Sequence, residues 1–222
     1  MTGYPHMAEV PDWDEEIVYP RRGDTLFQRA NVQNEKILFA DWLAGDWAMY
    51  PDGYKMAADM VVDSMTGHAW EDRLILPIIF MYRHYVELKI KHIIIELDRL
   101  AGTRIDTDRF RKHNLQSLWQ YLIAHLNCIR SEPNKEIMSA TERLINELNT
   151  LDPDSMHFRY ATDKERLNAM PLPHSLSMIG FKNGMEKLKC GLDYVAAGID
   201  VETEGRAIDA DIYAEMRSYM DF

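Results

Sequence analysis

Three short clusters of polar residues carry the side chains most able to do chemistry in this chain of 222 residues. The first cluster contains Arg83, His84 and Glu87. Arg83 and Glu87 are four residues apart, so on a helix they share one face and can pair. Both lie on or beside an apolar stripe, so we expect the pair partly inside a helical bundle, where charges need good partners. The pair belongs either to a binding site or to a contact that orients helices, and the sequence leaves both interpretations open.

The other two clusters lie further along the chain. His113 begins the run His-Asn-Leu-Gln-Ser-Leu-Trp, and it is a candidate binding residue at the start of a helix. The alternative is a helix cap formed by Asn114, with the histidine as a local hydrogen-bond partner. The third cluster holds Arg159, Tyr160 and Lys164, in an irregular segment bounded by prolines. An arginine beside an aromatic ring is a frequent platform for an anion or a base, but it can also tie a loop to the bundle.

Strong local motifs for catalysis or metal binding are absent from the sequence. We find no Gly-rich phosphate loop, no His-Glu-x-x-His, no Cys-x-x-Cys and no nucleophile elbow. His84 and His92 lie two helical turns apart, roughly 12 Å by helical rise, so they cannot share one metal ion. Two cysteines, Cys128 and Cys190, are too few for a disulfide scaffold or a structural zinc site. We therefore expect reduced thiols, no metal and no cofactor.

Helices must position these clusters, because apolar residues recur at helical spacing over most of the chain. We expect Pro51 to end one helix, Asp52 to cap the next, Gly102 to stop the longest and Gly205 to separate the last two. Pro77 fits the start of the longest helix, since the first helical turn tolerates proline. The expected helices cover 34–50, 52–65, 71–101, 114–126, 135–151, 176–204 and 208–220. Sustained two-residue alternation is absent, so the fold class predicted is all-α, an up-and-down helical bundle.

The same pattern divides the chain into three parts. Residues 1–33 form an irregular acidic arm, residues 34–204 the helical bundle domain, and residues 205–222 a short acidic C-terminal helix. Prolines interrupt every helical pattern in the arm, which is why we expect no regular structure there.

Overall charge excludes one broad class of function. The chain has 25 Lys and Arg against 36 Asp and Glu, a net charge of −11, so it carries no basic coat for nucleic acid. Much of the excess acid lies at the two ends, whereas the connection at 101–113 is locally basic, through Arg104, Arg109, Arg111 and Lys112. The longest apolar run, Leu74–Tyr82, is half the length that a bilayer requires, and no signal peptide is visible. We expect a cytoplasmic protein with no membrane contact and with one local cationic site.

In their order along the chain, the three clusters resemble the HEPN (higher eukaryotes and prokaryotes nucleotide-binding) superfamily of helical bundles. The resemblance rests on a long helix with Glu87-Leu88-Lys89, a His-x-Leu-x-x-Leu helix start at His113, a later Arg159-Tyr160 turn and a final helix, over residues 50–200. It implies a homodimer. It also implies either a metal-independent ribonuclease or a non-catalytic binding partner, of the kind found in toxin–antitoxin and other bacterial defence systems.

The ribonuclease members carry an arginine followed by a histidine, with about four to six residues between them, so that a cation and a proton carrier converge at a helix start. This chain departs from that pattern, since no histidine follows Arg159 within seven residues. Whether it is an enzyme, and which residues would be catalytic, stays open. We favour a non-catalytic or divergent dimeric module that binds nucleotide, RNA or a partner protein. Its predicted cleft is lined by Arg83, His84, His113, Arg159, Tyr160 and Lys164.

Two alternative functions remain. One is a ribonuclease toxin with a rearranged site, in which His113 or His84 replaces the missing histidine and Arg159 holds phosphate. The other is a structural or antitoxin-like partner, whose acidic arm and acidic C-terminal helix cover a basic protein surface.

Overall fold

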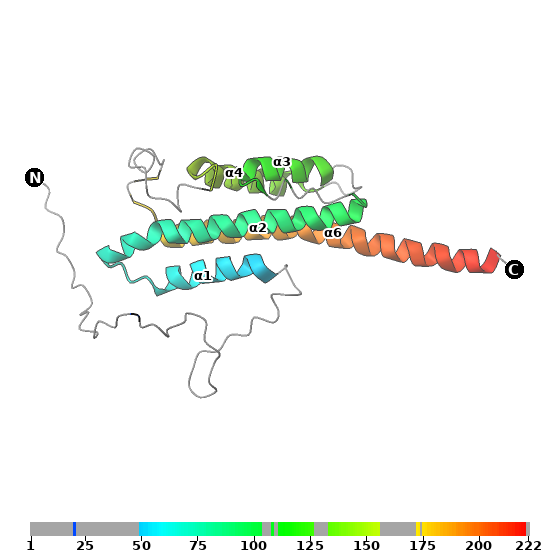
Figure 1. The fold of residues 1–222 in the computed structure, drawn as a ribbon, viewed down its shortest axis with the longest axis horizontal. Coiled ribbons are helices and arrows are strands. Elements are labelled where there is room, and N and C mark those ends of the chain that lie inside the picture. The colour runs from blue at the N-terminus through cyan, green and yellow to red at the C-terminus, as the bar shows by residue number, and fades with distance from the viewer. Residues whose placement is uncertain are drawn as a thin grey trace, which may run out of the picture.

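The computed structural model describes residue 20 and residues 49–103, 108, 111–126, 133–155, 172–173 and 175–220. Every regular element within these ranges is helical, which confirms the all-α fold class (Figure 1). The elements are α1 (Tyr50–Ser64), a short 3₁₀ helix η3 (Ala69–Leu74), α2 (Ile75–Ala101), α3 (Leu115–Leu126), α4 (Lys135–Leu151) and α6 (Met178–Met220). The predicted arm at 1–33, except Pro20, and almost all of the predicted helix at 34–50 lie outside the described residues.

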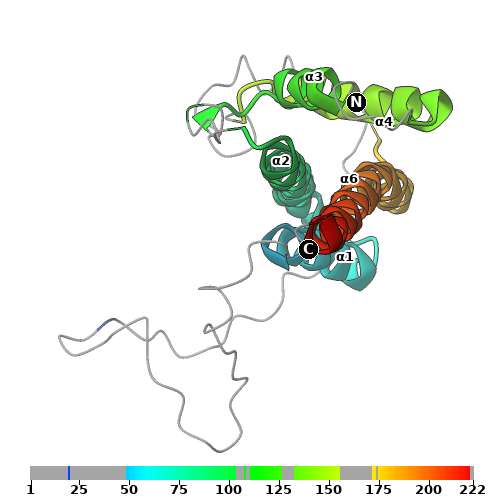
Figure 2. The same cartoon turned by 90° about the vertical axis from the view of Figure 1, so that its right-hand side faces the viewer.

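Helices α2 and α6 form the middle layer of the bundle, with α1 on one side and α3 and α4 on the other (Figure 2). The core centres on α2, where Tyr82, Tyr85 and most of the isoleucines are buried against the other helices. Trp119, Leu122, Ile145 and Leu192 contribute buried side chains from α3, α4 and α6. This packing gives α2 neighbours on several faces and explains why its apolar pattern is so wide.

Helix α3 runs in the same direction as α2, so the expected strict up-and-down order is wrong at this connection. The carbonyl of His113, just before α3, lies beside Arg83, whereas Tyr121 further along α3 bonds to Asp98 near the end of α2. The residues at 83 and 113 therefore lie at one level of the bundle, and those at 98 and 121 lie at another.

The start of α1 corrects another expectation. Pro51 was expected to end a helix and Asp52 to cap the next one, but α1 begins at Tyr50 and contains both residues in its first turn. A first-turn N–H has no helical partner, so proline loses nothing there, and an acidic side chain there favours the helix dipole. The expectation that Gly102 stops α2 is confirmed, since its φ of 65° is a left-handed cap.

Helix α6 continues without a break through Gly205, so the expected separate C-terminal helix is wrong. A Cβ at Gly205 would meet nothing within 4 Å. A glycine inside a helix costs only about 1 kcal/mol relative to alanine, which the flanking helix formers outweigh. Arg206 also holds this part of α6, because it donates to Glu202 in the preceding turn and to the Leu100 carbonyl of α2.

Close packing between α4 and α6 depends on a different glycine. A Cβ at Gly191 would stand 2.1 Å from the hydroxyl oxygen of Thr141, so only glycine permits this approach. Gly198, two turns further along α6, has open space at the same position. The contact between α4 and α6 is therefore set by the residue at 191.

Two buried tyrosines of α2 differ in how their hydroxyl groups are satisfied. Tyr82 donates to a carboxylate oxygen of Asp59 on α1 at 2.6 Å, and Asp59 also pairs with Lys55. Lys55 in turn reaches Glu186 on α6 at 2.6 Å, so this cluster joins α1, α2 and α6. The Tyr85 hydroxyl is fully buried and has no hydrogen-bond partner within the described part of the chain. Burial raises the pKa of Tyr85, because the ionised form is disfavoured there.

Candidate functional site

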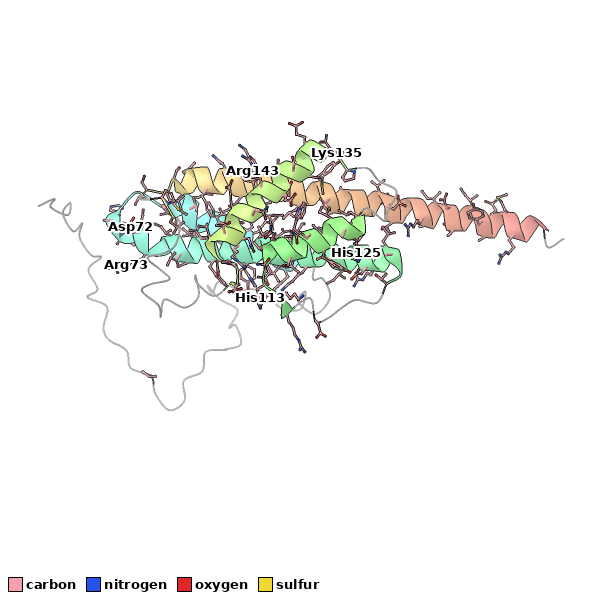
Figure 3. The ribbon with its side chains drawn as sticks, turned by 90° about the horizontal axis from the view of Figure 1, so that it is seen from above. Asp72, Arg73, His113, His125, Lys135 and Arg143 are labelled. Carbon is pink, nitrogen blue, oxygen red and sulfur yellow. The ribbon has the colours of Figure 1, made fainter. Side chains whose placement is uncertain are left out.

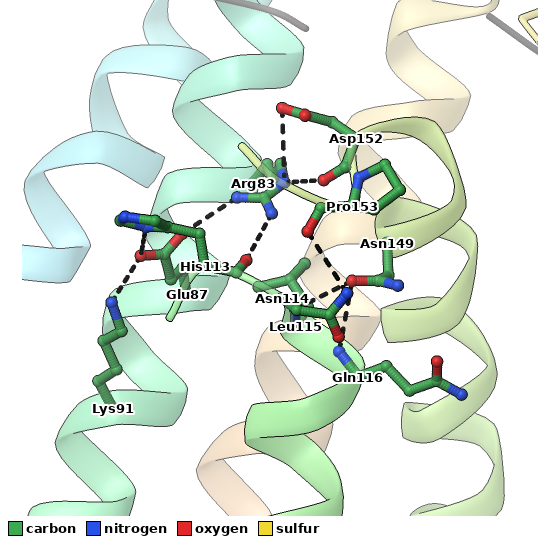
Figure 4. Close-up of polar contacts among 10 residues, drawn as sticks. All are labelled: Arg83, Glu87, Lys91, His113, Asn114, Leu115, Gln116, Asn149, Asp152 and Pro153. Carbon is green, nitrogen blue, oxygen red and sulfur yellow. Dashed lines mark hydrogen bonds and ion pairs between the residues drawn. The ribbon is translucent and has the colours of Figure 1, made fainter. Parts of the chain in front are cut away.

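One fully buried arginine joins three helices of the bundle (Figure 4). The Arg83 Nε donates to the carbonyl of Asp152 at 2.9 Å, and its Nη2 donates to the carbonyl of His113 at 2.7 Å. Its Nη1 lies 3.1 Å from a carboxylate oxygen of Glu87 on the same helix. The guanidinium therefore fixes the residue before α3 and the residue after α4 against the middle of α2.

Glu87 forms the second centre of this network. Its other carboxylate oxygen accepts from Lys91 Nζ at 2.7 Å and lies 2.9 Å from His113 Nδ1. Burial by itself would raise the pKa of Glu87, but the Lys91 hydrogen bond and charge, with the His113 contact, lower it overall. Glu87 is thus a carboxylate at neutral pH. The expectation that Arg83 and Glu87 pair inside the bundle is confirmed.

Asparagine side chains satisfy the start of α3. The Asn114 side chain accepts from the N–H of Ser117 at 2.9 Å, which confirms the predicted cap. Asn149, at the end of α4, accepts from the N–H groups of Leu115 and Gln116. With these donors already occupied, the helix start itself offers no ready anion site. Sequence reasoning missed Asn149, because nothing local to it marks a contact 34 residues away.

His113 is the point at which this network reaches solvent. Its side chain is 43% exposed, whereas that of Glu87 beneath it is 1% exposed. Figure 3 shows His113 at the edge of the bundle, with His125 further along α3. Arg111 and Lys112 precede it and are exposed, and Arg111 approaches Asp108 at 3.7 Å. Three consecutive residues with basic side chains thus stand at one edge of an otherwise acidic protein. We call residues 111–113 the basic edge.

His84 does not join this cluster, although it is adjacent to Arg83 in the sequence. Its ring contacts Tyr54 of α1 edge-on, with centroids 4.5 Å apart, and stacks on Phe80 with centroids 5.6 Å apart. Consecutive helical residues point about 100° apart, so His84 faces α1 while Arg83 faces α3 and α4. A single cleft lined by both side chains is therefore not formed.

The remaining predicted site residues, Arg159, Tyr160 and Lys164, lie outside the described residues, as do Arg104 and Arg109. Their part in binding stays a prediction.

Within the described ranges, no group of three or more His, Cys, Asp or Glu side chains is arranged to hold a metal ion. Among the same residues, no helix is both long and apolar enough to cross a membrane. The described residues at the basic edge offer electrostatic and hydrogen-bonding contacts.

A cavity of about 480 Å³ lies between α4 and α6, and Ile79 of α2 also lines it. Its lining is mostly apolar, including Leu148, Leu172, Phe181 and Leu188, with Glu147 and Thr150 among the polar contributors. None of the predicted site residues that the structure describes lines it. Its described lining shares no residue with the Arg83 network or the basic edge, although Leu151 directly precedes Asp152.

The fold and the site together define an all-helical bundle with a small exposed cationic edge and a buried ion network, in which each guanidinium nitrogen of Arg83 has a hydrogen-bond acceptor. Comparison with protein-family models, with curated proteins and with solved structures finds no match to this chain.

Proposed function

We propose that this chain is a non-catalytic binding module of the HEPN type that takes a phosphate-bearing ligand, a nucleotide or RNA, at its basic edge. The observation that carries the proposal is the exposed His113, held by a buried carboxylate beside two exposed cations. As the resemblance implies, the module would work as a cytoplasmic homodimer in a bacterial defence or toxin–antitoxin setting.

The buried network supports a positioning role for its members. Each of the three guanidinium nitrogens of Arg83 already has a hydrogen-bond acceptor, and Glu87 already has Arg83, Lys91 and His113. Neither group can exchange these partners for a ligand without leaving a buried charge uncompensated, which costs several kcal/mol. Their effect at the surface is to fix where the His113 ring stands.

The basic edge supports an anionic ligand. Arg111, Lys112 and His113 present cationic or proton-donating groups within three residues, and arginine and lysine are the usual phosphate contacts. His113 Nδ1 is occupied by its bond to the Glu87 carboxylate, which leaves Nε2 for a ligand. The sequence has no histidine within seven residues after Arg159, which supports binding rather than RNA cleavage.

Fluorescence anisotropy tests the proposal, with a labelled single-stranded RNA and a labelled adenine nucleotide titrated at several salt concentrations. We expect salt-sensitive binding by the wild type and at least a tenfold loss in the double variant Arg111→Glu/Lys112→Glu. The matched control is Arg143→Glu, an exposed cation of α4, which should bind like the wild type. Each lost phosphate contact should reduce the slope of log K against log salt by about one.

Two results would overturn the proposal. One is no salt-sensitive binding of either probe well above micromolar protein. The other is an equal loss in the Arg143 control and in the basic-edge variant. RNA cleavage that survives EDTA would instead favour the ribonuclease function.

A further inference from the structure

The C-terminal part of α6 leaves the bundle and carries an apolar face that no described element covers. We call residues 200–217 the overhang. Figure 1 shows its C-terminal part projecting beyond the ends of α1, α2, α3 and α4. Ile199 is the last core residue of α6, and Arg206 bonds to the Leu100 carbonyl at the end of α2. Beyond this bond, residues 207–217 of α6 are all exposed with respect to the described part of the chain.

Four large apolar side chains of the overhang are well exposed. Val201 is 70% exposed, Ile208 60%, Ile212 49% and Met216 55%. Their spacings of seven, four and four residues place them on one side of the helix, which we call the apolar stripe. At 100° per residue, Arg206 lies about 140° around the helix from Val201. The stripe therefore faces away from the contact with α2.

Carboxylates border the stripe on both sides. At about 100° per residue, Glu202 and Asp209 lie some 80–100° to one side of Val201, and Glu204 and Asp211 lie some 60–80° to the other. The overhang contains six acidic residues and two arginines, and the arginines lie on the opposite face of the helix. An apolar seam with charged borders is the arrangement by which helices pair side by side, and the border charges select the partner.

The sign of these borders excludes several occupants. Nucleic acid and anionic lipid surfaces would meet like charge at both edges of the stripe. A second copy of the overhang would place carboxylates against carboxylates, whether the two helices ran parallel or antiparallel, because both borders are acidic. Charge complementarity leaves an apolar surface flanked by Lys or Arg.

We propose that the overhang docks a basic amphipathic helix of another protein, with its apolar side on the stripe and its cations against the two acidic borders. The stripe spans 16 residues, about 23 Å of helix or two heptads, which suits one short partner helix. This interaction is separate from ligand binding at the basic edge, since it uses the opposite kind of charge on a different element.

Binding to designed peptides tests this proposal with the full chain. The first probe is a labelled 18-residue amphipathic helix with leucines on one face and lysines on both borders. The second replaces the lysines with glutamates, and the third keeps the lysines but replaces the leucines with serines. We expect only the first to bind tightly, at least tenfold more tightly than the other two, and to weaken as salt rises.

The variant Ile208→Asp/Ile212→Asp should reduce the affinity for the first peptide more than tenfold. Tyr213→Asp is the matched control, since Tyr213 is 72% exposed but lies off the stripe, and it should bind as the wild type does. Equal binding of the glutamate or serine peptide would overturn the proposal, as would an equal loss in the Tyr213 control. Self-association in sedimentation equilibrium that the Ile208/Ile212 variant abolishes would assign the stripe to a second copy instead. RNA binding at the basic edge should be unchanged in the Ile208/Ile212 variant, so the two proposals fail separately.

Discussion

Replacing Arg83 with methionine should destabilise the bundle strongly, because the buried guanidinium connects three helices. Methionine keeps a long side chain at a fully buried position but provides none of the three hydrogen bonds. The carbonyls of Asp152 and His113 would each lose a charged donor. Glu87 would keep Lys91 and His113, so its charge would not be left alone.

The size of the effect follows from these losses. A buried acceptor left without its donor costs about 1–3 kcal/mol, and two carbonyls are affected. Burying the apolar methionine chain offsets about 1 kcal/mol of this. We expect the free energy of unfolding to fall by about 3 kcal/mol in Arg83→Met. Arg83→Lys keeps the charge but cannot reach all three acceptors, and it should lose about half as much.

Urea unfolding followed by far-ultraviolet circular dichroism measures these differences. The matched control is Arg99→Ala, which removes an exposed arginine paired with Glu96 on the same helix and should change stability by less than about 0.5 kcal/mol. If Arg83→Met fails to fold, Arg83→Lys still gives the measurement. An Arg83→Met protein as stable as the Arg99 control would refute a joining role for the buried network.

Three further predictions use the same unfolding assay. The pKa of Glu87 is lowered in the fold, so its ionised form stabilises the protein at pH values above the ordinary glutamate pKa of about 4.3. This stability is lost as pH falls through the folded pKa. Glu87→Gln should therefore lose less stability than the wild type between pH 7 and pH 3. Gly191→Ala should lower the free energy of unfolding by about 1–3 kcal/mol, because the added Cβ clashes with Thr141 of α4. Gly198→Ala, in open space, should raise it by up to about 1 kcal/mol. Equal effects of the two substitutions would contradict the close approach of α4 and α6. Tyr82→Phe should lower the free energy of unfolding by about 1.5–3 kcal/mol, because the hydrogen bond to the Asp59 carboxylate is lost. Tyr85→Phe should leave it unchanged or raise it. The reverse order would contradict the two hydroxyl environments.

Local signals in the sequence predicted local structure well. Helix α4 occupies 135–151 as expected, because Asn134 caps its start and accepts from two N–H groups of the first turn. The stop at Gly102 and the pairing of Arg83 with Glu87 were likewise predictable, since each depends on residues within one helix. These features need only helical spacing and the chemistry of one residue type.

Features that depend on distant residues could not be predicted in the same way. The carbonyl of Asp152, which Arg83 bonds, lies 69 residues away along the chain, and the carbonyl of His113 lies 30 residues away. The direction of α3 relative to α2 follows from contacts such as that of Tyr121 with Asp98, 23 residues apart, and not from any pattern within the helix. The continuation of α6 through Gly205 depends on flanking helix and on Arg206, which outweigh a weak local stop signal.

Nuclear magnetic resonance of the histidine rings tests the central claim most directly, namely that a phosphate-bearing ligand binds at the basic edge. The imidazole resonances of the whole protein would be followed while a short RNA, and separately an adenine nucleotide, is added. With at least one probe, the account predicts a saturable shift of the His113 resonances and no comparable shift of His84, which packs between Tyr54 and Phe80. An unchanged His113 ring at saturating concentrations of both probes, or equal small shifts of all histidines, would contradict the claim.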